Sequence, residues 1–271
     1  MYLVGHDERG ALYAVGQFIR SANLAKGRIA LPESLSISTA PVYAMRGHQL
    51  GYRKTANSYD AWTVETYEQY VRDCIIFGAN AVEVIPSFNE EEDQSPVMPV
   101  PQEQMNRKIS GMLAPYGIDV WLFLELAEDV RNPEEYRQAL EARDAMFAQY
   151  PAIDHVMVPG GDPGDTEPQD LMPWLAEMVQ VLRKHFPEAG LWVSNQGFTD
   201  EQNEIFFGYL QEQQPEWLTG VILGPWTQIT LKEMRERTPE RYPIRRYPDI
   251  THSVRCQYPV PDWDRAFSQL M

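Results

Sequence analysis

The chain has 271 residues, of which 44% are hydrophobic, 11% aromatic and 23% charged. This balance excludes an intrinsically disordered, collagen-like or coiled-coil protein, and the length allows one large domain or two smaller ones. The 39 Asp and Glu residues outnumber the 23 Lys and Arg residues and give a net charge of −16. That charge argues against nucleic acid or an anionic membrane surface as the main partner.

Two cysteines, Cys74 and Cys256, are too few for a disulfide framework, and no CxxC pair indicates a zinc or redox site. No apolar run approaches the about 18 residues that a membrane span needs. The first residues lack the basic and apolar parts of a signal peptide. We therefore expect no cofactor, no metal and no membrane segment, and both a cytoplasmic and a secreted protein stay open.

The amino-terminal part of the chain differs from the rest. Apolar residues at helical spacing predict a helix over residues 8–20, with Asp7 as its N-cap. Residues 34–39 alternate like a short strand, and prolines punctuate this part of the chain. We place a boundary near residue 40, between a small unit (1–40) and a larger domain (41–271).

In the larger domain, short apolar runs alternate with amphipathic helices. Seven runs are expected to form strands: residues 42–50, 81–86, 118–126, 155–159, 191–194, 218–223 and 242–247. Such continuously apolar strands are typical of a parallel sheet covered on both faces. The alternation permits an open doubly wound sheet or a closed (β/α)8 TIM-type barrel. No glycine-rich phosphate loop follows the first strand, and polar residues follow nearly every strand, which favours the barrel.

The eighth unit of that barrel is the difficulty. Only 24 residues follow Tyr247, and three of them are prolines. The last element is therefore either irregular or missing.

The strongest local signal follows the fourth predicted strand, where two glycines precede Asp162 and Asp165. Glycoside cleavage needs a proton donor for the leaving oxygen and a second group at the anomeric carbon. Two neighbouring carboxyl groups can have their pKa values pushed apart, which gives one acid and one base. The alternative is a turn in which both Asp side chains cap backbone amides.

Two further carboxylates, Glu83 and Glu125, stand inside otherwise apolar strands. An unpaired buried charge is costly, so each is expected either to line the mouth of the barrel or to belong to a buried ion pair. Glu125 is the third catalytic candidate, and Glu83 is a candidate substrate contact.

Other polar and aromatic residues near strand ends are candidates for holding a sugar ring. Guanidinium groups form paired hydrogen bonds, amides orient hydroxyl or acetamido groups, and Trp offers a flat apolar face. The alternatives are a solvated loop for residues 46–53 and core packing for Trp226. Asp249 and His252 alone are too few for a metal site. These candidates are Arg46, His48, Tyr52 and Arg53; Asn195 and Gln196; Trp226; and Asp249 and His252.

Three of these segments resemble glycoside hydrolases of the group that contains family 20 β-N-acetylhexosaminidases and family 67 α-glucuronidases. The sequence DERGALY, residues 7–13, is similar to the start of the helix that ends a small α/β domain before their barrel. Arg46 and the following glycine match the pair that opens that barrel, and the GGD sequence ending at Asp162 is similar to their Gly-Gly-Asp-Glu motif. The resemblance implies that Arg46 contacts sugar hydroxyls and that Asp162 orients an acetamido group. Pro163 replaces the family's acid, which leaves Asp165 as a candidate for that role.

The resemblance implies a hydrolase that releases a terminal N-acetylhexosamine or uronic acid from an oligo- or polysaccharide. The alternative is a non-catalytic or degenerate carbohydrate-binding barrel, which Pro163 favours. An aldolase or isomerase barrel is a more distant alternative, because no lysine stands at a predicted strand end. Residues 1–40 would be the remnant of the small α/β domain. We expect a fragment or a reduced member whose open sheet edges favour a homo-oligomer.

Overall fold

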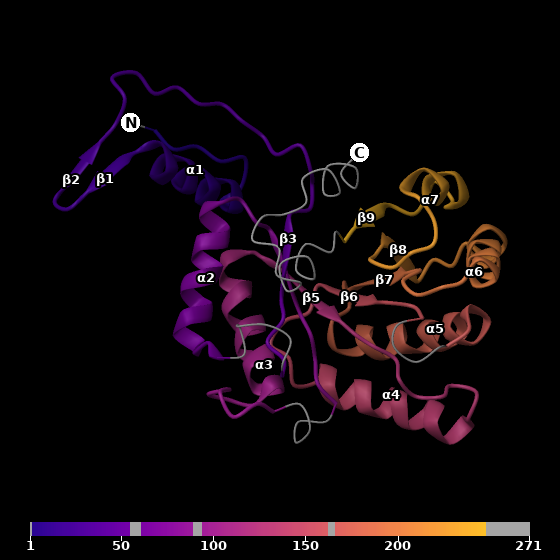
Figure 1. Cartoon of the computed structure of the whole chain (residues 1–271). Helices are drawn as coiled ribbons and strands as arrows, with labels where there is room; N and C mark the ends of the chain where they lie inside the picture. Colours follow the sequence, from indigo (N-terminus) through magenta and orange to yellow (C-terminus); the bar gives the residue numbers. More distant parts are fainter. Residues whose placement is uncertain (1, 55–60, 89–93, 162–165, 248–271) are drawn as a thin grey trace. The chain divides into compact units, whose positions relative to one another are not determined.

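The computed structural model describes residues 2–54, 61–88, 94–161 and 166–247 (Figure 1). The chain divides into two compact units, Met1–Trp121 and Leu122–Met271. We consider each unit by itself. The boundary near residue 40 stays a prediction.

A seven-stranded sheet follows the chain order β3-β4-β5-β6-β7-β8-β9. Its strands are β3 (Gly47–Leu50), β4 (Ala81–Val84), β5 (Asp119–Phe123), β6 (His155–Val158), β7 (Gly190–Ser194), β8 (Leu218–Leu223) and β9 (Ile244–Arg246). The β3–β4, β6–β7, β7–β8 and β8–β9 pairs are parallel. This topology is that of an incomplete (β/α) barrel with seven strands in the described residues, which confirms the predicted fold class.

Helices alternate with these strands, as the sequence pattern predicts. They are α1 (Glu8–Ser21), α2 (Val64–Ile76), α3 (Gln102–Leu113), α4 (Pro133–Phe147), α5 (Pro168–His185), α6 (Asp200–Gln213) and α7 (Leu231–Arg237), and a short 3-10 turn, Ala114–Tyr116, extends α3. Thr199 and Thr230 start α6 and α7 with reciprocal capping boxes. No described helix is long and apolar enough to span a membrane.

The predicted helix over residues 8–20 and its Asp7 N-cap are confirmed by α1, but residues 22–46 depart from the expected pattern. The strand predicted over residues 34–39 is wrong, and an antiparallel hairpin forms earlier, from β1 (Asn23–Ala25) and β2 (Arg28–Ala30). The first barrel strand begins at Gly47 rather than at residue 42. The hairpin was missed because its strands are three residues each, too short for a clear alternation.

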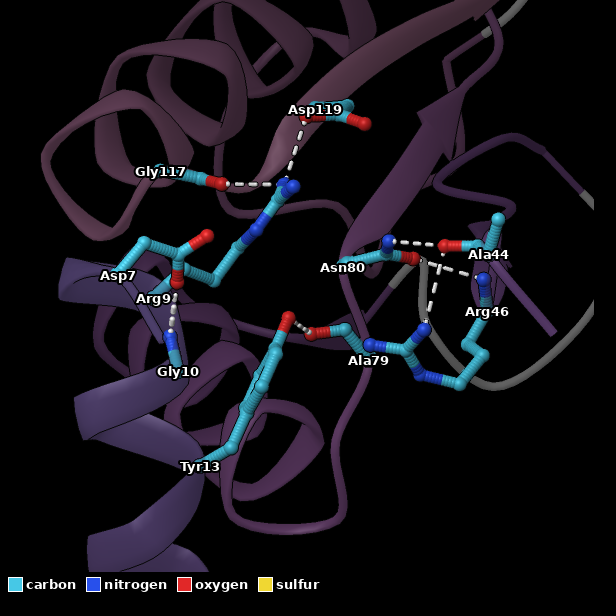
Figure 2. Close-up of polar contacts among 10 residues, drawn as sticks. All are labelled: Asp7, Arg9, Gly10, Tyr13, Ala44, Arg46, Ala79, Asn80, Gly117 and Asp119. Atoms are coloured by element: carbon cyan, nitrogen blue, oxygen red, sulfur yellow. Dashed lines mark hydrogen bonds and ion pairs between the residues drawn. The ribbon is translucent and has the colours of Figure 1, made fainter. Parts of the chain in front are cut away.

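Helix α1 is fixed to the first unit by the DERGALY sequence (Figure 2). Asp7 caps the helix by accepting a 2.6 Å hydrogen bond from the backbone N–H of Gly10. Arg9 Nη1 donates to the carbonyl oxygen of Gly117 at 2.9 Å and to Asp119 Oδ1 at 3.0 Å. The helix is therefore held at the amino end of β5.

A second group of contacts fixes the amino ends of β3 and β4 (Figure 2). The Tyr13 hydroxyl donates to the carbonyl oxygen of Ala79 at 2.8 Å. The Asn80 amide accepts from the Arg46 backbone N–H and donates to the carbonyl oxygen of Ala44, both at 2.7 Å. In this structure the DERGALY sequence thus docks α1 against the amino ends of the neighbouring strands.

Gly16 lets α1 approach α2 closely. A Cβ at this position would lie 2.6 Å from the carbonyl oxygen of Ile76. We expect Gly16→Ala to lower the free energy of unfolding by about 1–3 kcal/mol, because the backbones must separate. Gly208→Ala is the matched control, since a Cβ there meets no atom within 4 Å; it should stabilise α6 by about 0.5–1 kcal/mol. Urea unfolding followed by circular dichroism measures both, and equal stability of Gly16→Ala and the wild type would contradict the close contact.

Candidate functional site

Strand β3 of the first unit shows which side of the sheet faces a helix. The ring Nδ1 of His48 lies 2.7 Å from the hydroxyl of Tyr70 in α2, so His48 points toward that helix. Successive side chains of a strand point to opposite faces, so Gln49 points away from α2. Gln49 Nε2 donates to Oε1 of its cross-strand partner Glu83 at 2.9 Å. Gln49 and Glu83 therefore share the face opposite α2, which is the interior face in a (β/α) barrel.

Glu83 is the most strongly perturbed carboxyl group among those described. Its exposed fraction is 8%. Burial raises the pKa of Glu83 to about 7, although the hydrogen bond from Gln49 acts in the opposite direction. Within the described ranges Glu83 makes no ion pair, so the alternative of a buried ion pair finds no partner there. Its role as a substrate contact stays a prediction.

This pKa makes stability depend on pH. Glu83 binds its proton more tightly in the folded chain (pKa about 7) than at its ordinary value of 4.5. The contribution of Glu83 to the free energy of unfolding therefore falls as the pH rises from about 4.5 to about 7. Relative to the wild type, we expect Glu83→Gln to gain about 2–3 kcal/mol between pH 5 and pH 8. Urea titrations at the two pH values measure this, and a constant difference between the two proteins would contradict it.

Arg46 lies at the opposite end of β3 from the one expected. Its Nε donates to the carbonyl oxygen of Gly78 at 2.7 Å, and its Nη1 donates to those of Tyr43 and Ala44 at 2.7 and 3.2 Å. The expectation that Arg46 lies at the end of the first strand is wrong, because that strand begins at Gly47 and Arg46 precedes it. These carbonyl contacts occupy the guanidinium at the amino end of the strand, so its position gives no support to a sugar contact.

The other three candidates near β3 are spread over different surroundings. His48 was expected beside the site but lies against α2, where burial lowers its pKa and favours the neutral ring. Tyr52 is fully buried, and its hydroxyl donates to the carbonyl oxygen of Val100 at 2.6 Å. Arg53 follows the carboxyl end of β3 and is half-buried. Of this group, Arg53 has the position that a ligand contact at the strand ends requires.

A group of polar residues that the sequence analysis missed holds the turn after β4. Gln102 Nε2 and Asn106 Nδ2, both on α3, donate to the carbonyl oxygen of Ile85 at 2.9 and 2.5 Å. The carboxylate of Glu103 accepts from the backbone N–H of Ser87 at 2.7 Å. All three α3 side chains are buried. Their spacing on one helix face was the available signal, but polar residues at a helix start are ordinarily interpreted as solvated.

In the second unit, the turns after three neighbouring strands come together. The backbone N–H of Gly161, after β6, donates to the carbonyl oxygen of Gln196, after β7, at 3.0 Å. Gly160 has φ +76°, and a Cβ there would lie 2.3 Å from the carbonyl oxygen of Ser194. A Cβ on Gly224, after β8, would lie 2.7 Å from the Ser194 Oγ. Glycine at these positions thus permits the close approach that brings β6, β7 and β8 ends to one place.

Asn195 and Gln196 lie inside this group of turns and are 0% and 3% exposed. Asn195 Nδ2 donates to Oδ1 of Asn203 in α6 at 2.8 Å, and Asn203 Nδ2 donates to the carbonyl oxygen of Thr199 at 2.8 Å. The Asn195 Oδ1 is buried and accepts no hydrogen bond from the described residues. Its amide is thus oriented by α6 and retains one acceptor for another donor.

Glu125 and Trp226 lie at two other strand ends. Glu125 is half-buried after β5, and its carbonyl oxygen accepts from Arg143 Nη2 at 2.9 Å. The Arg143 side chain is 1% exposed and forms a bidentate ion pair with Glu128, which sequence analysis did not single out. Trp226 follows β8, is 57% exposed and has φ +54°. That exposure excludes the alternative of core packing, which would bury the ring.

The remaining candidates, Asp162, Asp165, Asp249 and His252, lie outside the described residues. Their assignments stay predictions from the sequence. Across residues 2–54, 61–88, 94–161 and 166–247, no group of three or more His, Cys, Asp or Glu side chains could hold a metal ion.

No family model and no curated protein matches this sequence. Solved structures do match in fold. CpGH84B has a TM-score of 0.63 at 13% identity, covering 92% of this chain and 46% of that chain. The Flavobacterium johnsoniae chitobiase FjGH20 has a TM-score of 0.60 at 13% identity, covering 93% and 46%. A mutant Streptomyces plicatus β-hexosaminidase in complex with its product GlcNAc has a TM-score of 0.52 at 11% identity, covering 80% and 56%.

These matches define the fold class. The chain has the barrel fold of family 20 and family 84 glycoside hydrolases, which confirms the predicted likeness at the level of fold. It spans about half the length of those solved proteins.

Proposed function

We propose that this chain is the barrel of a glycoside hydrolase that releases a terminal sugar, an N-acetylhexosamine or a uronic acid, from an oligo- or polysaccharide. The observation that carries the proposal is the fold, which matches a family 20 chitobiase over 93% of the chain. The glycine turn after β6 supports it, because Asp162 and Asp165 follow directly in the sequence. The complex of a structural neighbour with GlcNAc supports a carbohydrate ligand.

In this proposal, Asp162 and Asp165 supply the acid and the second carboxylate, with Glu125 as the further candidate. The acid gives its proton to the glycosidic oxygen as the bond from that oxygen to the anomeric carbon breaks. The second group stabilises or attacks the anomeric carbon, and water finally adds there while losing its proton to a carboxylate. Within the second unit, Gln196 and Trp226 are proposed to contact the sugar ring, while the substrate contacts expected of Arg53 and Glu83 in the first unit stay predictions from the sequence.

A panel of 4-nitrophenyl glycosides tests this proposal. It includes the β-N-acetylglucosaminide, the β-N-acetylgalactosaminide and the α- and β-glucuronides, with the β-glucoside as a comparison. We expect the full chain to release 4-nitrophenolate from an N-acetylhexosaminide or a glucuronide. A panel with no release from either class would contradict a hydrolase of this specificity.

The second candidate function is a carbohydrate-binding barrel without catalysis. Pro163 favours it, because it stands where the resembling enzymes carry their acid. Binding of N-acetylglucosamine in calorimetry, without hydrolysis of any panel member, would support this function over the first.

A further inference from the structure

We propose that Gln49 and Glu83 form an uncharged hydrogen-bonding subsite that binds a neutral sugar ring and selects an N-acetylhexosamine over a uronic acid. This inference rests on the proposed function and narrows its substrate class. It uses only residues of the first unit and adds Gln49, which sequence analysis did not single out.

The geometry places two hydrogen-bonding groups side by side on the face away from α2. Gln49 and Glu83 are cross-strand partners in β3 and β4, and one amide N–H bridges them at 2.9 Å. That bond leaves Gln49 with its carbonyl oxygen and a second N–H, and it leaves Glu83 with its second oxygen. Within the described part of the first unit, no other hydrogen bond fixes these groups. A vicinal pair of sugar hydroxyls, each a donor and an acceptor, matches this arrangement.

The charge environment favours a neutral ligand. Two titratable groups on the neighbouring strands β3 and β5 contact other residues, His48 with Tyr70 of α2 and Asp119 with Arg9. Burial raises the pKa of Glu83 and the Gln49 hydrogen bond lowers it, and no charged neighbour among the described residues contributes. A uronate carboxylate bound here would be a second buried acidic group, with no cation beside it in the described part of the first unit, which is costly.

Glu128 in the second unit is a half-buried carboxyl group whose pKa is shifted in the opposite direction from that of Glu83. Burial raises the pKa of Glu128, but the pairing with Arg143 and backbone hydrogen bonds together outweigh it, so the pKa is lowered. Glu83 has no such partner among the described residues and keeps its proton near neutral pH. A protonated carboxyl group donates a hydrogen bond as well as accepting one, which an ionised group cannot do.

The test is calorimetric binding of N-acetylglucosamine and of glucuronic acid to the full chain at pH 6 and pH 8.5. With a Glu83 pKa of about 7, N-acetylglucosamine should bind about 30-fold more weakly at pH 8.5 than at pH 6 if binding requires the protonated group. Glu83→Gln keeps a neutral donor and acceptor and should remove this pH dependence. Glu83→Ala should bind about tenfold more weakly than the wild type at pH 6. Glucuronic acid should bind about tenfold more weakly than N-acetylglucosamine at both pH values.

Glu65→Gln, at the exposed start of α2, is the matched control that removes the same charge and should bind as the wild type does. Thermal unfolding at pH 6 checks that Glu83→Ala is folded. The inference is overturned by any of three results: N-acetylglucosamine does not bind, the pH dependence persists in Glu83→Gln, or glucuronic acid binds equally well. Glycoside hydrolysis by the same preparations reports separately on the proposed function, since pH-dependent binding without hydrolysis keeps the subsite and rejects the hydrolase.

Discussion

Asp162→Asn and Asp165→Asn should each lower kcat for glycoside hydrolysis by about 10²- to 10⁴-fold, the range contributed by a general acid or base. Asn has nearly the same size as Asp but cannot transfer a proton or carry the negative charge. Steady-state kinetics on the glycoside that the wild type cleaves fastest would measure the loss. A profile of kcat against pH would show which variant loses the acidic limb and which loses the basic one.

Asp200→Asn is the control for these variants, because Asp200 is exposed in the first turn of α6. It should keep the kcat of the wild type. All three variants should unfold at the temperature of the wild type, which separates a chemical loss from a structural one. Full activity in both Asp162→Asn and Asp165→Asn would remove the acid and base assignments and leave Glu125 as the remaining candidate.

Glu128→Gln should lower the free energy of unfolding by about 3 kcal/mol. Arg143 is nearly inaccessible to solvent and forms an ion pair with Glu128. The variant removes the carboxylate charge that faces this buried guanidinium, which also contacts the carbonyl oxygen of Glu125 and the ring of Trp174. Urea unfolding at pH 7 measures the change.

The double variant Glu128→Gln/Arg143→Met tests whether the loss comes from an uncompensated charge. It should be more stable than Glu128→Gln alone, because a buried ion pair can be replaced by apolar groups at little cost. Glu134→Gln removes one side of an exposed pair with Arg137 and should leave the stability unchanged. A double variant no more stable than the single one would show that packing around Arg143, rather than its charge, determines the effect.

The regular part of the fold could be predicted because its signals are local. The apolar run at residues 218–223 coincides with β8, and the helix expected between that run and the next is α7, which a capping box starts. Runs of this kind and caps at helix starts reflect burial and hydrogen bonding within a few residues. The β1–β2 hairpin has neither signal and could not be placed.

The site was harder to predict because it depends on strand ends and faces. The glycines after β6 and the polar residues after β7 were expected at one edge, and the hydrogen bond from Gly161 to Gln196 brings them together. Arg46 was misplaced because the first barrel strand begins at Gly47 rather than at residue 42, which puts Arg46 before its amino end. The contact of His48 with Tyr70 depends on the packing of α2 against β3, and no local pattern predicts it. The pairing of Arg143 with Glu128 joins residues 15 positions apart, and no local pattern predicts it.

Arg9 and Tyr13 make their contacts at the amino ends of β5 and β4, so stability and ligand specificity can be changed at different ends of the strands. In a (β/α) barrel, residues at the amino ends of the strands support stability, whereas residues at the carboxyl ends carry the chemistry. A mutagenesis library restricted to α1 and its partners should therefore change thermal tolerance in the first unit without altering specificity. A second library, at the carboxyl ends of the strands, could then be made in the most heat-tolerant of these variants and screened for altered ligand specificity.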